Sequence, residues 1–403
     1  MDNVLTLYLF ELKKLWKRKL VKIASCCLFA VAVFTIVSPL FGSYSLGVVT
    51  ESNAEGVRKD AAYREALDGR LLNQELLEEV YAAYSKVPYE NGKYSGTKEY
   101  QQYARPYSSV FNMVRDLTGW NTEKVMLGTP QEEELYQRWN DVVEKSWRSN
   151  YLSESELSFW RSIKQEIETP IRFEAISDSF YELLLGISEL GLMSIFVVML
   201  CLAGVFSEEH SQRTDQLLLC SKHGKRMLYS VKVAAGISFA GMISIGSSAL
   251  AIGIAFLLYG TQGFDAPFYY LYMSEYIYPI TIWEAILVAY VMVLAACIVT
   301  AVITMVLSEL VHSSLATVSI TTAVVVAGMF FNIQGKYRVA AQLWDCLPSR
   351  FAMGDKIFNT RMIPMPGGYL QVWQAVPILY LLLGIVFVWI GRLAYDRYQV
   401  SGR

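Results

Sequence analysis

Long apolar stretches alternate with polar segments along the chain. An α-helix needs roughly 20 apolar residues to cross the roughly 30 Å of hydrocarbon in a bilayer, so the length of each stretch is the first guide to its role. Stretches of about this length or longer lie at 23–41, 190–206, 233–259, 280–307, 311–332 and 373–391. We therefore predict six transmembrane helices. For 190–206 and 373–391, a buried core helix is the alternative.

The segment 43–188 is the one polar stretch long enough to fold as a separate domain. Three sequences in it match the capping box, in which a hydroxyl and a later Glu satisfy free backbone amides at the start of a helix. They are Ser52-Asn53-Ala54-Glu55, Thr129-Pro130-Gln131-Glu132 and Ser153-Glu154-Ser155-Glu156. The run from Ile176 to Glu189 is predicted to continue directly into the second span. The expected fold class is an all-α polytopic membrane protein with a mostly helical extracytoplasmic domain between transmembrane helices 1 and 2.

Tyrosines gather where proline and glycine interrupt the helical pattern of this domain. They are Tyr89, Tyr94, Tyr100, Tyr103 and Tyr107. Tyrosine suits contact with a ligand or a partner, and it equally suits a small core beside a membrane surface. We favour the core and keep the ligand as the alternative.

The first 22 residues combine helically spaced apolar positions with lysines that fall largely between them. The apolar positions are Leu5, Tyr8, Leu9, Leu12, Trp16 and Leu20. This pattern is typical of a helix that lies in the membrane interface, and the alternative is a plain cytosolic extension of the first span. The following apolar run is too long for a signal peptide and has no small-x-small cleavage site at its end, so 23–41 is predicted to be a retained anchor.

Composition and charge support the membrane class and suggest an orientation. The chain is 54% hydrophobic and 18% charged, against about 25% charged residues in soluble domains. Basic residues concentrate in 1–22, 207–232 and the tail 392–403, and the positive-inside rule places these segments in the cytoplasm. The outer segment 43–188 carries 24 acidic and 16 basic side chains. The outer connection 334–372 is the exception to the rule, because it is also basic.

The sequence offers no site for catalysis, a metal or a cofactor. The predicted spans have no Asp, Glu, Lys, Arg or His in their interiors, and ion-coupled carriers usually keep an ionisable group there. No phosphate-binding glycine loop, zinc-binding His-Glu-x-x-His helix or Gly-x-Ser-x-Gly elbow is present. No Cys/His pair has metal-ligand spacing. The chain is therefore not expected to be an enzyme, and any ATP hydrolysis is expected in another chain.

The segment 207–232 leaves the second span and enters the third. It begins Phe206-Ser207-Glu208-Glu209, continues through Thr214 and the leucines 217–219, turns at Gly224-Lys225-Arg226 and ends at Lys232. This arrangement resembles the permease subunits of type-2 ATP-binding-cassette exporters, in which the same stretch is a coupling helix that docks on the ATPase. The resemblance covers the six-span plan, the amphipathic helix before the first span and an outer connection before the last span that often re-enters the membrane.

The resemblance implies which residues act and with what. ATPase-coupling residues would be Glu208, Glu209, Arg213, Thr214, Leu217, Leu218 and Leu219. The leucines would form an apolar ridge and the charges would set its register; the alternative for Glu208 and Glu209 is a solvated helix end. Members commonly have Gly-Thr after the glutamates, where this chain has Arg213-Thr214.

The same resemblance implies the partners. These would be ATP-binding-cassette ATPase subunits that hold ATP and magnesium, a second permease chain in a homo- or heterodimer, and membrane lipids; nucleic acid is not expected. The location would be the cell membrane, with both termini cytoplasmic.

The uncharged spans fit an apolar or amphipathic exported substrate, such as a peptide, an antibiotic or a lipid. Two other classes of function stay open. A membrane receptor or accessory subunit would sense a ligand through 43–188, and co-purification of an ATPase would argue against it. A pore or secondary carrier would show transport that persists without ATP.

Overall fold

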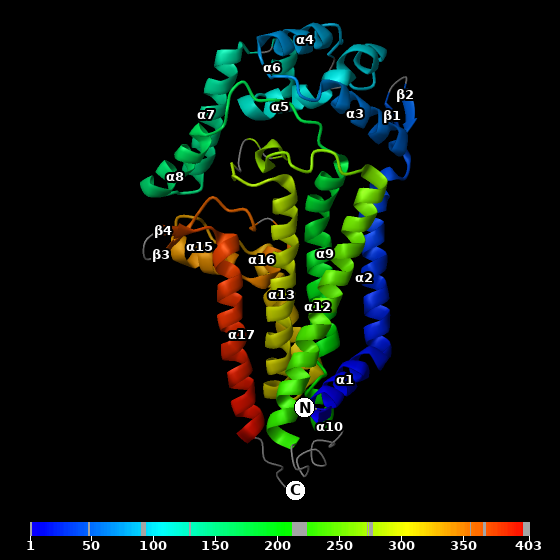
Figure 1. Ribbon diagram of the computed structural model, residues 1–403, viewed down its shortest axis with the longest axis vertical. Helices are drawn as coiled ribbons and strands as arrows, with labels where there is room; N and C mark the ends of the chain where they lie inside the picture. Colours follow the sequence, from blue (N-terminus) through cyan, green and yellow to red (C-terminus); the bar gives the residue numbers. More distant parts are fainter. Residues whose placement is uncertain are drawn as a thin grey trace.

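The structure is a computed structural model that describes residues 2–46, 49–89, 94–128, 130–211, 224–271, 273, 277–354, 356–365 and 368–397. It consists of a long helix bundle with a smaller, mainly helical domain at one end (Figure 1). The all-α prediction is confirmed for the described residues: strands are confined to two short antiparallel pairs, β1–β2 (Ser43–Leu46 and Val49–Ser52) and β3–β4 (Ile363–Met365 and Gly368–Leu370).

Five helices among the described residues are long and apolar enough to cross a membrane. They are α2 (Lys19–Val37), α9 (Asp178–Leu202), α12 (Gly224–Tyr259), α13 (Ile282–Val311) and α17 (Val372–Arg397). The stretch predicted as the fifth span, 311–332, forms α14 (Ser314–Phe330), which is apolar but only 17 residues long. The multi-pass membrane character is thus confirmed at the level of five candidate spans.

The bundle is built around α9 and α13. In the most apolar window of α9, 78% of the residues are buried, against 17% in α17, so α17 lies at the edge and offers its apolar side chains outward. α9 continues without a break from the smaller domain, called the outer domain below for its place at one end of the molecule, into the bundle, as predicted from the sequence. Its first turns carry polar residues that the hydropathy pattern had assigned to the domain alone, which explains why the helix starts twelve residues before the predicted span at 190.

The outer domain contains α3 (Asn53–Leu67), α4 (Gln74–Tyr84), α5 (Ser108–Thr118), α6 (Thr122–Leu127), α7 (Glu132–Ser149) and α8 (Glu154–Gln165). Aromatic side chains dominate its core: Trp139, Trp147 and Trp160 are buried, and the rings of Tyr84 and Phe111 stack with centroids 3.9 Å apart. Three of the five clustered tyrosines, at 94, 100 and 107, pack against this core, and Tyr89 and Tyr103 are exposed.

Two of the three predicted capping boxes are confirmed. Ser52 with Glu55 starts α3, and Ser153 with Glu156 starts α8. Thr129 of the third predicted box lies outside the described residues, and α7 begins at Glu132 with Gln131 at its cap position. Glu132 instead accepts a hydrogen bond from the backbone amide of Gln74, whose side chain accepts one from the amide of Glu132, so the two helix starts cap each other.

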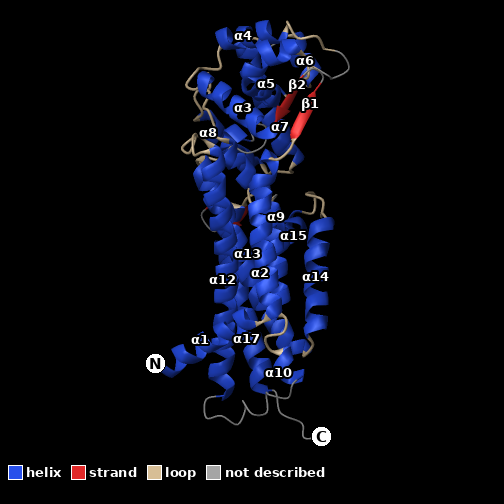
Figure 2. Ribbon diagram, turned by 90° about the vertical axis from the view of Figure 1, so that its right-hand side faces the viewer, coloured by secondary structure: helices blue, strands red, loops and turns tan. Residues whose placement is uncertain are grey.

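At the opposite end of the bundle, α1 (Asp2–Lys17) is a helix separate from α2. The extended backbone of Arg18 breaks the two apart, which sets aside the simple extension of the first span. One side of α1 packs on α12, where Trp16 meets the edge of Phe239 and the Tyr8 hydroxyl hydrogen bonds to that of Ser238 at 2.8 Å. Leu5, Leu9 and Phe10 stay exposed, as an interfacial helix requires. Figure 2 shows α1 leaving the bundle at this end.

The connection between α14 and α17 folds back against the bundle. It contains α15 (Arg338–Asp345) and α16 (Pro348–Ala352), and the β3–β4 hairpin lies beside them. α16 packs against α9, α13 and α14. The contact with α9 is close because Gly191 has no side chain: a Cβ there would lie 2.2 Å from the carbonyl oxygen of Ala352.

Candidate functional site

The predicted coupling residues divide between described and undescribed parts of the chain. Glu208 and Glu209 lie in α10 (Ser207–Ser211), directly after α9, at the end of the bundle that also holds α1. Arg213, Thr214, Leu217, Leu218 and Leu219 lie outside the described residues. The apolar ridge therefore stays a prediction, and the structure shows what anchors the two ends of the segment that contains it.

Glu209 joins three helices through one carboxylate. It is 9% exposed and forms ion pairs with Lys14 of α1, at 2.8 Å, and with Lys232 of α12. The side chain of Lys232 is completely buried, and Glu11, itself buried, lies 3.8 Å from the Lys14 ammonium. Two carboxylates thus balance two ammonium groups, which is the condition under which charges are tolerated away from water.

Glu208 makes a second, more exposed contact to the first two helices. Its carboxylate lies 2.9 Å from the guanidinium of Arg18, the residue at the break between α1 and α2. The side chain of Glu208 is about half exposed, so this ion pair is screened by water. The alternative interpretation, a solvated helix end, therefore holds in part for Glu208 and does not hold for Glu209. We call the group Glu11, Lys14, Arg18, Glu208, Glu209 and Lys232 the inner charge clamp.

The backbone turn between α9 and α10 is held by α13. The hydroxyl of Ser308 donates a hydrogen bond to the carbonyl of Ala203 at 2.6 Å and accepts from the amides of Phe206 and Ser207 at 3.4 and 3.1 Å. These are backbone groups that the end of a helix leaves without partners inside the helix. The segment 207–211 is thereby fixed to α1, α12 and α13 at once.

From the sequence, Lys14 and Arg18 were expected only as part of the basic segment 1–22, and Lys232 only as the end of the segment 207–232. Their partners are distant in sequence, since 195 residues separate Lys14 from Glu209. A signal existed for Lys232, because it stands where the chain re-enters an apolar stretch and a lysine there must either reach water or find a carboxylate. The signal for Ser308 was weaker, because a lone serine near a helix end has many local uses.

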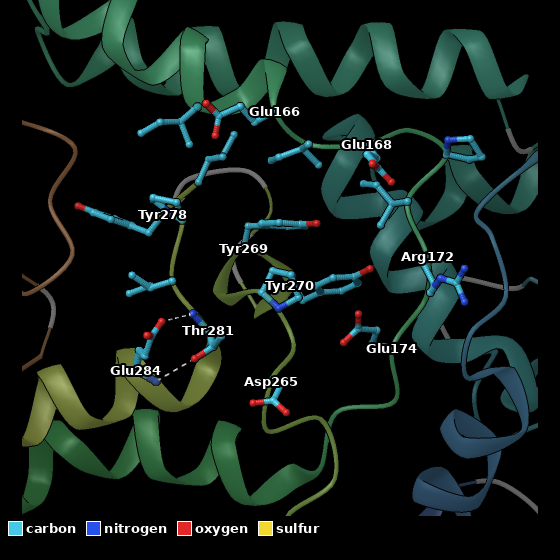
Figure 3. Close-up of a pocket in the computed structure, with 18 of the residues that line it drawn as sticks. Glu166, Glu168, Arg172, Glu174, Asp265, Tyr269, Tyr270, Tyr278, Thr281 and Glu284 are labelled. Carbon is cyan, nitrogen blue, oxygen red and sulfur yellow. Dashed lines mark hydrogen bonds between the residues drawn. The ribbon is translucent and has the colours of Figure 1, made fainter.

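A cleft of about 570 Å³ lies at the other end of the molecule, where the chain between α8 and α9 meets the connection from α12 to α13. Figure 3 shows the rings of Tyr269 and Tyr270 near its centre, with Tyr278 to one side. Carboxyl groups stand around these rings. They belong to Glu166, Glu168, Glu174, Asp265 and Glu284, and among the described residues of the lining Arg172 is the one basic side chain.

The electrostatics of this outer cleft are dominated by negative charge. Partial burial and the nearby carboxylates of Asp68 and Asp265 raise the pKa of Glu174, while Arg172 opposes that shift. Burial, followed by the charge of Glu174, raises the pKa of Tyr269 to about 12. The cleft thus carries more negative charge than its own residues compensate. It was not predicted, because its walls come from segments about 100 residues apart and neither carries a recognisable motif.

A second cavity, of about 530 Å³, opens between α12, α13 and α17 within the apolar part of the bundle. Its lining is aliphatic and aromatic except at one end. The lining includes Ile237, Val299, Tyr380, Ile385, Trp389 and, at the inner end, Arg392. We call it the bundle groove.

Among the residues that the structure describes, no three His, Cys, Asp or Glu side chains are placed to hold a metal ion. Comparison of the sequence with family models and with curated proteins gives no match.

Proposed function

We propose that this chain is the permease subunit of an exporter driven by a separate ATP-binding-cassette ATPase. ATP and magnesium would be held by the partner ATPase subunits, and a second permease chain would complete the membrane pathway. The observation that carries the proposal is the inner charge clamp, together with Ser308. The residues 207–211, which precede 212–223 in the chain, are fixed to α1, α12 and α13.

A force applied to 212–223 would be transmitted to several helices, because each contact of the residues that flank this segment is made with a different helix. α10 follows α9 directly, Lys232 lies in α12, Lys14 lies in α1, and Arg18 lies at the break between α1 and α2. The buried pair of Glu209 and Lys232 resists separation, since pulling either charge away leaves the other unpaired in an apolar setting. In this proposal the clamp converts the approach of two ATPases into a joint shift of the helices.

The proposed topology has six spans, with α14 as the fifth. α14 has 17 residues and would cross with the help of its flanking residues, because a short span is accommodated by local thinning of the bilayer. The location proposed is the cell membrane, with both termini cytoplasmic and the domain of α3 to α8 extracytoplasmic. The basic residues of α1 and of the end of α17 lie at one end of the bundle, away from that domain, which supports this orientation.

The bundle groove supports an apolar or amphipathic substrate, such as a peptide, an antibiotic or a lipid. Its apolar walls suit the body of such a molecule, and Arg392 at the inner end suits an anionic or polar head. The groove opens on α17, which is the most exposed of the long helices.

The decisive experiment is isolation of the native complex in mild detergent, followed by identification of the co-migrating chains and measurement of their ATP turnover. Leu218→Asp should lower recovery of the ATPase at least tenfold, because it places a charge in the predicted apolar contact. Glu208→Gln should leave recovery within about fivefold, since the exposed pair contributes about 1 kcal/mol or less, and should weaken the link between ATP turnover and transport. Glu123→Gln, an exposed change in the outer domain, is the control.

The same experiment also tests the alternative function, a membrane receptor. If no ATPase migrates with the unaltered chain, the permease assignment fails. The alternative, a membrane receptor or accessory subunit that senses a ligand through its outer domain, then takes its place.

A further inference from the structure

The outer cleft has no part in the proposed coupling, which takes place at the other end of the bundle. Its volume of about 570 Å³ is within the range of sites that enclose small ligands, roughly 300–1,000 Å³. A neighbouring cavity of about 360 Å³ shares Arg172, Glu174 and Asp265 with it. The two spaces together form one extended cleft along the junction of the outer domain and the bundle.

The walls of the cleft combine two kinds of surface. Ile163, Ile167, Ile171, Pro170 and the tyrosine rings provide apolar area. Tyr269 and Tyr270 stack on each other with centroids 5.1 Å apart, and Tyr269 also approaches Trp139 at 6.4 Å, so the rings form a fixed aromatic surface. Both tyrosines are only half buried, which leaves part of each ring open to the cleft.

The carboxylates face this aromatic surface from two sides. In Figure 3, Glu166 and Glu168 lie on one side of the tyrosine rings, and Glu174 and Asp265 lie on the other. Within the described part of the chain, none of these four carboxylates forms an ion pair. Nor do they converge in the manner of metal ligands, since no group of three suited to a metal is found among the described residues.

We propose that the outer cleft binds an organic cation that carries an apolar or aromatic body. A cation over the face of a tyrosine ring is attracted by the negative charge density of the ring, and carboxylates spread around the rings add attraction from several directions. A small metal ion would not be coordinated by carboxylates that stand this far apart, and it would leave most of the aromatic area without a contact. An anion would be repelled, and a neutral body would leave the acidic rim unused.

The raised pKa of Glu174 agrees with this assignment, because burial and the neighbouring negative charges disfavour its ionised form in the empty cleft. A bound cation would offset both effects. Binding is therefore expected to weaken as the pH falls and Glu174 becomes protonated.

The position of the cleft would let a ligand act on the bundle. Ser177, at the start of α9, donates a hydrogen bond to the carbonyl of Tyr259 at the end of α12, at 2.6 Å. The indole of Trp139 donates to the carbonyl of Met273 at 2.8 Å. The cleft thus lies between the outer domain and the bundle, which these hydrogen bonds connect. A ligand in it would contact both the chain before α9 and the chain before α13. The inference does not depend on the proposed export function.

The test uses the full chain in nanodiscs of zwitterionic lipid, without any ATPase. Binding of radiolabelled tetraphenylphosphonium is measured by equilibrium dialysis, with empty nanodiscs subtracted, and its neutral counterpart is triphenylphosphine oxide. Saturable binding is expected for the cation and binding about tenfold weaker or more for the neutral compound. Equal binding of the two compounds would overturn the proposal, because the charge would then contribute nothing.

Two matched pairs of substitutions locate the site. Glu174→Gln with Asp265→Asn should weaken the cation about tenfold or more, since each removes a charge at the rings. Glu65→Gln with Glu123→Gln removes the same charge from exposed helices of the outer domain and should change binding less than about twofold. Equal effects of the two pairs would also overturn the proposal.

Tyr269→Leu keeps the apolar volume and removes the ring, so it should weaken the cation and leave triphenylphosphine oxide within about twofold. Unaltered unfolding midpoints confirm that the variants remain folded. If a variant does not fold, the double substitution Glu166→Gln with Glu168→Gln, on the exposed rim of the cleft, is used in its place. Displacement of the probe by saturable calcium binding would make the cleft a metal site and reject the organic cation.

Discussion

A single buried lysine dominates the electrostatics at the end of the bundle that holds α1. Lys232 has no exposed side-chain surface and faces Glu209, which also pairs with Lys14. Such an arrangement rarely gains stability over apolar side chains, but breaking it is costly because an unpaired charge remains. The function of the pair is therefore better sought in the geometry it enforces between α9, α12 and α1 than in its net contribution to stability.

Lys232→Met tests this view. Removal of the ammonium leaves Glu209 buried with Lys14 alone, and the substitution should destabilise the chain by about 3 kcal/mol. Combining it with Glu209→Gln removes both charges and should recover part of that loss, so that the double variant is less destabilised than the sum of the two single variants. Thermal unfolding in nanodiscs, followed by tryptophan fluorescence, measures all three variants. Additive effects of the two substitutions would show that Lys232 and Glu209 do not interact energetically.

Glu156 is a comparable residue in the outer domain. Its side chain is fully buried, and its carboxylate accepts hydrogen bonds from the backbone amides of Met362 and Ser153 and pairs with Arg338. Burial alone would raise the pKa of Glu156, but Arg338 and the amides outweigh it and lower the pKa below its ordinary value. A carboxyl with a lowered folded pKa stabilises the folded state fully above its unfolded pKa of about 4.3 and loses that contribution as the pH falls through the folded value.

Glu156→Gln should therefore destabilise the chain by about 2 kcal/mol at pH 7. The difference between the unaltered chain and the variant should shrink below about pH 4, where the glutamate becomes neutral as well. Unfolding midpoints at a series of pH values from 7 to 3 provide the measurement. A difference that stays constant over this range would mean that the charge of Glu156 has no role.

These residues show where sequence analysis succeeds and where it ends. The capping role of Glu156 was predicted because its partner, Ser153, is three residues away. Its pairing with Arg338 was not, because 182 residues separate the two and only the fold brings them together. The same holds for Glu209, whose local sequence suggested a coupling segment and gave no sign of the three helices it joins.

At the scale of elements, apolar length predicted the helices of the bundle well and their ends less well. α9 and α12 both extend beyond the predicted spans, because a helix continues past the hydrocarbon wherever tertiary contacts support it. The fold of 334–372 was predicted only as an outer connection with a tendency to re-enter. Its glycines and prolines predict turns, but they do not predict that α16 packs on Gly191 of α9.

Gly191→Ala tests that contact. The added Cβ would meet the backbone of Ala352, which cannot turn away as a flexible side chain would, so the change should destabilise the chain by about 1–3 kcal/mol. Gly253→Ala in α12 is the matched control, because that position is exposed and a Cβ there has open space around it. The control should be neutral or slightly stabilising, since alanine favours a helix more than glycine does. Both are compared by thermal unfolding; equal midpoints for the two variants would show that α16 does not pack closely on α9.

At the scale of the whole molecule, the basic outer connection no longer conflicts with the charge rule. Arg338 pairs with Glu156, while Arg361 lies 2.8 Å and Arg350 3.6 Å from the carboxylate of Asp345, which is itself buried. These three arginines are held within the fold by two carboxylates. The positive-inside rule concerns basic residues near the membrane ends that interact with the lipid surface and the insertion machinery. The basic residues of α1 remain largely on the surface at the opposite end.

The orientation can be tested with one cysteine at each end, in a chain whose native cysteines are replaced by serine. Glu123 in α6 and Ser211 at the end of α10 are both exposed, so a cysteine at either position is accessible to a reagent on its own side. The uneven placement of lysine and arginine predicts that Glu123→Cys reacts with an impermeant thiol reagent in intact cells. Ser211→Cys should react only after the membrane is permeabilised. The opposite pattern would invert the topology and place the inner charge clamp outside the cell, where no cytoplasmic ATPase reaches it.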